Sequence, residues 1–265
     1  MIYQSIPAGP PSAVSQWWAS LSSAQQTTYM QAAPGTIGTL AGIPASVQAQ
    51  LRGTGGINRV ALVNYALNNT FDGVDDVDRD NCTNFVSDGL LAAGLDEIGH
   101  YPYGRSSTAN WYKTNVPGSG INIPGVGTPG GATRSYTWAD ASDLHTFLTH
   151  NGSTEVPYSQ AQPGDIVFYK NQSEGIYHSA VVTAKVNGQI FYTQHTPGEQ
   201  NASWGSRQSM PGITDSRDPT SVIIVRPGQD NPPLPHPQTG PTPSPPSAQT
   251  SPAGQSPDPR PNQAP

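Results

Sequence analysis

Residues 80–94 read DNCTNFVSDGLLAAG, and this stretch decides how the rest of the chain is interpreted. Its large apolar residues recur at helical spacing, at Phe85, Val86, Leu90 and Ala93. Asp80 and Asn81 are residue types that cap helix N-termini, and Gly94 is a common helix stop. The stretch therefore predicts a helix over Cys82–Gly94 with the cysteine in its first turn.

Cys82 is the only cysteine in the sequence, which excludes an intramolecular disulfide and a cysteine-rich zinc site. A free cysteine is most often an inert buried residue. The first turn of a helix, however, stabilises a thiolate through its positive dipole end and its unpaired N–H groups. The N–H groups at Cys82 and Thr83 would also hold an oxyanion. The position thus favours a nucleophilic cysteine over a structural one.

Two histidines are candidates for the base and for a residue that orients it. His178 precedes the β-branched run Ser179–Val186, and His195 follows the run Gln189–Gln194. Asn187-Gly188 between the runs predicts a hairpin. Both histidines then lie near its open end, with His178 as the base and His195 as the third member of a triad. A zinc site built from the two histidines and a carboxylate is the alternative, although the spacing matches no familiar ligand pattern.

Three further polar residues are candidates for supporting the site. Asp80 and Asn84 flank the cysteine in sequence, and Asp165 follows Pro163-Gly164 at the start of another β-rich run. An aspartate after Pro-Gly also commonly fixes the turn into a strand, and we prefer that structural interpretation for Asp165.

Composition divides the 265 residues into three regions. Residues 1–52 predict a small helical segment, in which Trp17 and Trp18 are expected to pack against the neighbouring domain. Residues 53–226 predict an α+β domain, with helices first and an antiparallel sheet afterwards. Residues 227–265 are proline-rich without periodicity, which predicts a disordered stalk or linker.

More detailed expectations follow from periodicity and turn residues. Helices are expected over 13–21, 24–33, 44–51, 58–67, 82–94 and 139–149, and strands over 165–169, 179–186, 189–194 and 221–226. Pro34-Gly35 is expected to end the second helix. Trp111, Tyr112 and Trp138 either line a groove for a sugar or peptide or pack in the core.

Several classes of partner are excluded or unsupported by the sequence. The net charge is −6 and no cluster of Lys or Arg is present, so nucleic acid is not an expected partner. No apolar run approaches the roughly 20 residues that a membrane-spanning helix needs. Residues 1–11 show no Sec-type signal peptide, so export would use another route or a longer precursor. No cofactor is expected.

The motifs NRVALVNYA, DNCTNFVSDGLLAAG, SYTWADASDLHTFL, QPGDIVFY, YHSAVVT and FYTQHT follow one another between about residues 57 and 200. In this order they resemble the putative amidase domain family, which is related to NlpC-like and CHAP-like cysteine hydrolases. The resemblance implies a papain-like fold, the catalytic pair Cys82 and His178, a polar third member matching His195, and peptidoglycan peptides as substrate. The sequence departs from the family at Asn81, usually Asp, and at Asp88, usually Gln.

Two other functions use the same residues. The first is a non-catalytic papain-like module that binds a cell-wall peptide or an exported partner. The second is a toxin-like amidase that acts on a protein side chain. The residues ahead of the domain, WWASLSSAQQ…IGTLAGIPASVQAQ, resemble a segment of exported actinobacterial proteins. This resemblance is compatible with secretion, with cell-wall association and with the toxin-like alternative.

Overall fold

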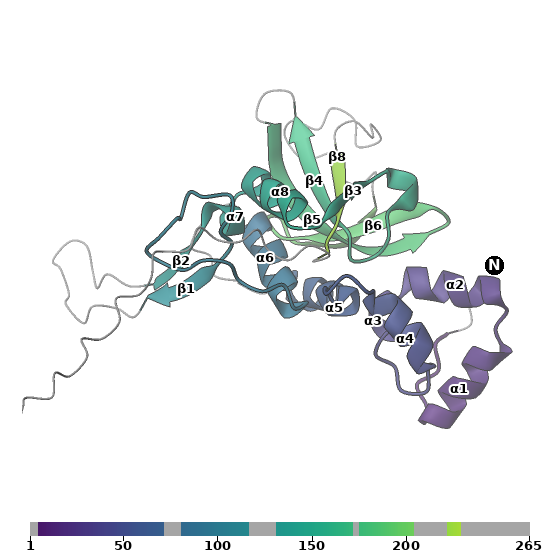
Figure 1. Ribbon diagram of the computed structural model, residues 1–265. Coiled ribbons are helices and arrows are strands. Elements are labelled where there is room, and N and C mark those ends of the chain that lie inside the picture. The colour runs from purple at the N-terminus through teal and green to yellow at the C-terminus, as the bar shows by residue number, and fades with distance from the viewer. Residues whose placement is uncertain (1–4, 72–80, 117–130, 172–174, 204–221, 229–265) are drawn as a thin grey trace, which may run out of the picture. The chain divides into compact units, whose positions relative to one another are not determined.

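The computed structural model describes residues 5–71, 81–116, 131–171, 175–203 and 222–228 (Figure 1). The predicted proline-rich stalk lies outside the described residues from residue 229 onward. None of the helices in the described part is long and apolar enough to cross a membrane.

The N-terminal segment consists of α1 (Pro11–Ser20), α2 (Ser23–Ala32), α3 (Pro34–Ile37) and α4 (Ala45–Arg52). Ser22 caps α2 through a complete capping box with Gln25. The predicted end of the second helix at Pro34 is confirmed, and Pro34 also begins the short helix α3. Proline is favoured there, since a first helical position needs no N–H donor.

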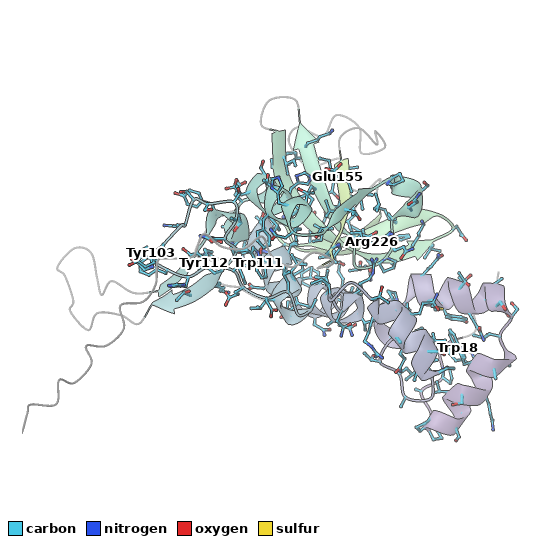
Figure 2. All side chains as sticks on the ribbon, in the orientation of Figure 1. Trp18, Tyr103, Trp111, Tyr112, Glu155 and Arg226 are labelled. Carbon is cyan, nitrogen blue, oxygen red and sulfur yellow. The ribbon has the colours of Figure 1, made fainter. Side chains whose placement is uncertain are left out.

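The two adjacent tryptophans of α1 belong to the segment's own core, which corrects the expected packing against the neighbouring domain. Trp18 is buried (labelled in Figure 2), and the Trp17 ring meets Tyr29 of α2 edge-on at 5.0 Å. Their apolar partners in this cluster are Val14, Leu21, Ile37 and Ile43. Ring-on-ring packing between α1 and α2 therefore replaces the predicted contact with the domain.

The segment is joined to the domain through a close approach of α3 to α5 (Arg59–Asn69). A Cβ atom on Gly35 would lie 2.1 Å from Asn64 Oδ1, and one on Gly38 would lie 2.5 Å from a Val60 methyl group. Only glycine allows the two helices to pack this closely.

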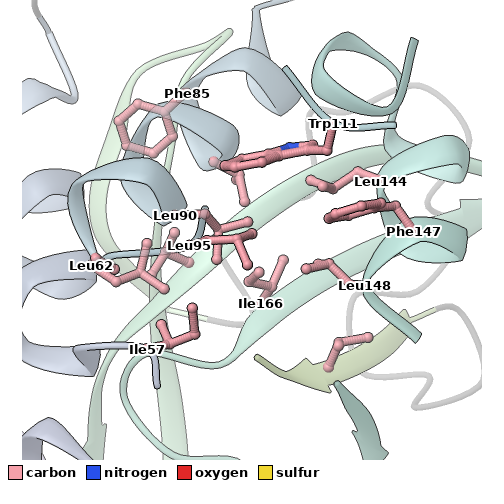
Figure 3. Close-up of a cluster of buried hydrophobic side chains, with 14 of the residues drawn as sticks. Ile57, Leu62, Phe85, Leu90, Leu95, Trp111, Leu144, Phe147, Leu148 and Ile166 are labelled. Atoms are coloured by element: carbon pink, nitrogen blue, oxygen red, sulfur yellow. The ribbon is translucent and has the colours of Figure 1, made fainter. Parts of the chain in front are cut away.

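The helices of the domain among the described residues are α5, α6 (Cys82–Ala92), α7 (Tyr136–Ala139) and α8 (Ala141–His150). Their apolar faces and one side of the sheet enclose the main core shown in Figure 3. Leu62, Phe85 and Leu144 in this core are fully buried. Trp111 stacks on Trp138 at 4.4 Å, and both indole rings are fully buried, so they belong to the core and not to a groove.

The main sheet has the strand order β3-β8-β4-β5-β6-β7 with antiparallel neighbours, and β1 pairs with β2 separately. The strands are β1 (Lys113–Val116), β2 (Gly131–Arg134), β3 (Thr154–Val156), β4 (Ile166–Asn171), β5 (Gly175–Val186), β6 (Gln189–Gln194), β7 (Glu199–Ser203) and β8 (Val222–Arg226), with a 3₁₀ turn at Tyr158–Gln160. A second apolar cluster lies on these strands, including Val167, Tyr169, Val182 and Tyr192. The α+β class and the order of helices before the sheet are thus confirmed.

The hairpin between β5 and β6 turns at Asn187 (φ 50°) and Gly188 (φ 81°), as the sequence predicts. The expected helices and the four expected strands are present, with ends shifted by a few residues. Strands β1, β2, β3 and β7 were not predicted. They are short and polar, and they lack the β-branched runs that indicate a strand.

Candidate active site

Cys82 is the first residue of α6 and is 5% exposed. Its Sγ lies 3.6 Å from Thr83 Oγ1. The helix forms because Phe85, Val86 and Leu90 all face the core, and it ends before Gly94, whose φ is 95°. The predicted place of the cysteine in the first helical turn is confirmed.

The start of α6 contacts the loop after β6. Asn81 occupies the N-cap position, but its side chain makes no capping hydrogen bond. Its backbone N–H instead donates to Thr196 Oγ1 at 3.2 Å. Asp80, the other predicted capping residue, lies outside the described residues. This contact brings the end of β6 to the helix turn that carries Cys82.

His178 lies near the beginning of β5 and is 3% exposed. It pairs with Tyr169 of β4 at a point where the register shifts by one residue, and the two rings are 5.6 Å apart. Such a bulge changes the direction of the side chains beside it. His178 Nε2 makes a 2.9 Å hydrogen bond with Gln194 Oε1.

Gln194, the last residue of β6, is fully buried, and sequence reasoning missed it. Its side-chain nitrogen donates to Pro197 O and to Glu199 Oε2, each at 3.2 Å. These two acceptors define which end of the amide is the oxygen. An amide oxygen only accepts, so the proton of the His178 ring must lie on Nε2. In the neutral ring, Nδ1 is then the basic nitrogen.

His195 directly follows Gln194, the last residue of β6, and contacts the next residue and α6. Its Nδ1 makes a 2.9 Å hydrogen bond with Thr196 Oγ1, and its ring lies 6.0 Å from Phe85 of α6. His195 therefore faces α6, while Gln194 holds His178.

Helix α6 and strand β5 meet beside the two candidate residues. Ser179 Oγ donates to Thr83 Oγ1 at 3.3 Å, and both side chains are buried. These residues directly follow His178 and Cys82 in sequence. The structure thus brings the cysteine turn, the start of β5 and the end of β6 into one region.

The polar face of α6 holds the segment that contains β1 and β2. Asn84 Oδ1 accepts a 2.7 Å hydrogen bond from Arg134, which is 4% exposed. Asn84 Nδ2 has no hydrogen-bond partner among the described residues. Asp88, where the resembled family usually has glutamine, forms a 3.1 Å ion pair with Lys113. These contacts fix the segment that contains β1 and β2 against α6.

Asp165 lies at the far end of β4 from the Tyr169–His178 pair. Four residues along a strand separate it from Tyr169, or about 13 Å. Its buried carboxylate binds Arg59 at 2.9 Å and Arg226 at 3.1 Å, and it accepts from the Gln162 N–H at 2.8 Å. These contacts support its role in the turn before β4 and not a role beside His178.

Within the described part of the chain, no group of three or more His, Cys, Asp or Glu side chains is arranged to hold a metal ion. His178 and His195 instead have the amide and hydroxyl partners given above.

We expect Gln194→Ala to lower kcat for hydrolysis roughly 10- to 100-fold, a part of what general acid–base catalysis contributes. The ring of His178 would lose the acceptor that keeps its proton on Nε2. The acidic limb of the pH–rate profile should also move, which a purely structural change would not cause. His195→Ala is the comparison, with a smaller loss expected. A larger loss in His195→Ala than in Gln194→Ala would reverse the two roles.

Comparison with known protein families identifies a match. The family model described as "Putative amidase domain" matches residues 58–216, which is more than half of the chain. The match includes Cys82, His178, Gln194 and His195. No curated protein and no solved structure matches the chain.

Proposed function

Because this chain belongs to the Putative amidase domain family, we propose that it is a cysteine-dependent amide hydrolase, with Cys82 as nucleophile and His178 as base. The family indicates an amidase-type hydrolase, and the residues around α6 supply the chemistry. Cys82 begins a helix, where a thiolate is favoured. It also lies beside the strand that carries His178.

The observation that carries the proposal is the hydrogen bond from His178 to Gln194. It selects the tautomer in which Nδ1 accepts a proton, and the two acceptors of the Gln194 amide hold that group in place. A base whose second nitrogen is oriented by a third group is the arrangement that activates a thiol. Gln194 replaces His195 as the orienting residue in this proposal.

In the acylation step, His178 Nδ1 takes the thiol proton and Cys82 Sγ attacks the amide carbonyl carbon. The backbone N–H groups at Cys82 and Thr83, which have no acceptor within α6, hold the resulting oxyanion. His178 then gives its proton to the amide nitrogen as the C–N bond breaks. An amine leaves, and the acyl group remains on Cys82 as a thioester.

In the deacylation step, His178 removes a proton from water while the oxygen adds to the thioester carbon. The oxyanion collapses and the C–S bond breaks, which releases a carboxylic acid. The proton on His178 returns the Cys82 thiolate to the thiol form. The imidazole of His178 thus acts in turn as base and as acid, which requires a single well-oriented ring.

We further propose that the domain has the papain-like arrangement. A helix with the nucleophile at its start, packed on an antiparallel sheet that carries the base and its orienting residue on adjacent strands, supports this proposal. Its substrates on this proposal are the peptides of peptidoglycan, which would place the enzyme outside the cytoplasmic membrane.

Incubation with peptidoglycan fragments tests this function. Purified protein should release new amine and carboxylate ends that mass spectrometry detects, and Cys82→Ala should release none. If the protein instead releases ammonia from protein side chains and does not cleave the fragments, the toxin-like alternative holds and peptidoglycan is not the substrate. Absence of both products, with Cys82 unlabelled by a thiol reagent, would overturn the hydrolase in favour of a binding module.

A further inference from the structure

A cavity of about 370 Å³ lies at the junction of the N-terminal segment and the domain. Its walls come from α2, the loop after α4, the start of α5 and the end of β8. Arg226, labelled in Figure 2, is the last residue of β8. The cavity is separate from the Cys82 region. Asp165, which contacts Arg59 and Arg226 of the cavity wall, lies about 13 Å along β4 from Tyr169, the residue that pairs with His178.

The charged side chains among the described residues that line the cavity are both arginines, Arg59 and Arg226. One carboxylate, that of the fully buried Asp165, contacts both guanidinium groups, at 2.9 and 3.1 Å. Within the described part of the chain, two positive charges therefore share one negative charge. A partly buried excess charge is unfavourable unless a further counter-charge is present.

Both guanidinium groups keep donors for such a counter-charge. Arg59 uses Nε and Nη2 to bind Pro163 O, and Arg226 uses Nε and Nη2 to bind Asp165 and Gln160 O. The Nη1 group of each has no hydrogen-bond partner among the described residues. Burial lowers the pKa of Arg59, Asp165 opposes that shift, and Arg226 adds to it. An additional anion would favour the charged form.

The side chain of Arg59, which lines the cavity, is closely packed before any ligand binds. A Cβ atom on Gly53 would lie 3.0 Å from Arg59 Cδ, and one on Gly164 would lie 2.8 Å from Arg59 Cβ. The backbone at these two glycines thus lies close against the Arg59 side chain. A preorganised guanidinium loses less conformational entropy when it binds an anion.

We propose that this cavity is a second ligand site, which binds a small molecule through a carboxylate or phosphate group held by Arg59 and Arg226. Arginine recognises both groups through paired N–H donors. Neutral polar residues on the wall, among them Gln50, Thr54 and Gln162, would contact the remainder of the ligand. The site does not depend on hydrolysis at Cys82.

Calorimetric and thermal-shift titrations of the full chain test this proposal. The probes are N-acetylalanine, its neutral amide and inorganic phosphate, at an ionic strength matched with NaCl. We expect saturable binding and a raised Tm with the carboxylate, the phosphate or both, and neither effect with the amide. The stronger of the two anions identifies the group that the site prefers. Equal binding of the amide, or no saturable binding of either anion, would overturn the proposal.

Three variants locate the binding. Arg226→Gln should weaken binding of the preferred anion at least tenfold. Arg52→Gln, which removes the same charge next to the cavity wall, should leave this binding unchanged. Thr54→Trp should fill the cavity and abolish binding while the ion pairs to Asp165 remain. If Thr54→Trp, or a folded Arg226→Gln, binds the anion like the wild type, the site is not in this cavity.

Discussion

Replacing Cys82 with alanine is expected to abolish amide hydrolysis, with a loss in kcat of about 10⁴- to 10⁶-fold, the range seen when single members of a catalytic triad are removed. No other thiol is present in the chain to replace it. The fold should persist, because the substitution removes one small atom from the start of α6, at a cost of about 1 kcal/mol. Rates, circular dichroism and thermal melting on one preparation measure both effects.

Cys82→Ser is the matched control, since it keeps the size and hydrogen-bonding capacity of the side chain but replaces the thiol with a much weaker nucleophile. We expect it to be folded and nearly as inactive as Cys82→Ala. A folded Cys82→Ala protein with activity within tenfold of the wild type would show that another group attacks the amide.

Replacing Asp165 with asparagine is expected to lower the free energy of unfolding by about 3–5 kcal/mol, the cost of removing one partner from a buried ion pair. Asp165 is fully buried between Arg59 and Arg226, whose side chains are 12% and 30% exposed, and the substitution leaves both cations uncompensated. The kcat of the folded fraction should stay near the wild-type value, because Asp165 lies far along β4 from His178. Urea unfolding and assays at low temperature separate these effects.

Asp143→Asn makes the same chemical change on α8 and serves as the control. Burial, followed by the charge of Asp140, raises the pKa of Asp143, so its ionised form opposes folding at neutral pH. Its removal should leave stability equal or slightly higher at pH 7. A loss in Asp165→Asn no larger than in Asp143→Asn would contradict the structural role of Asp165, and a large loss of kcat in the folded protein would restore it to the site.

The regular elements could be predicted because their apolar spacing and turn residues match the structure that they adopt. Helix α6 has apolar residues at helical spacing and a glycine stop, and the β5–β6 turn has Asn187-Gly188, where both residues adopt positive φ. Short strands such as β3 and β7 could not be predicted. These strands form because they pair with β8 and β6, and their own sequences do not specify a strand.

The place of Cys82 at the start of α6 could be predicted, while the residue of β6 that binds His178 could not. Counting from the hairpin turn places His195 near His178, but β5 and β6 shift register between Val182 and Ala184. A shift of one residue exchanges the faces of a strand, which brings Gln194 to the face of β6 that meets His178. No local pattern indicates such a bulge.

The most direct measurement of the central claim is the rate of Cys82 alkylation by iodoacetamide as a function of pH, in the wild type and in His178→Ala. Cys82 is the only cysteine, so the mass of the intact protein reports this one site. If His178 activates the thiol, the wild type should react well below pH 8, and the variant should titrate near the ordinary thiol pKa of about 8.5. Identical titrations in the two proteins, both at or above that value, would contradict the assignment of Cys82 and His178 as a catalytic pair.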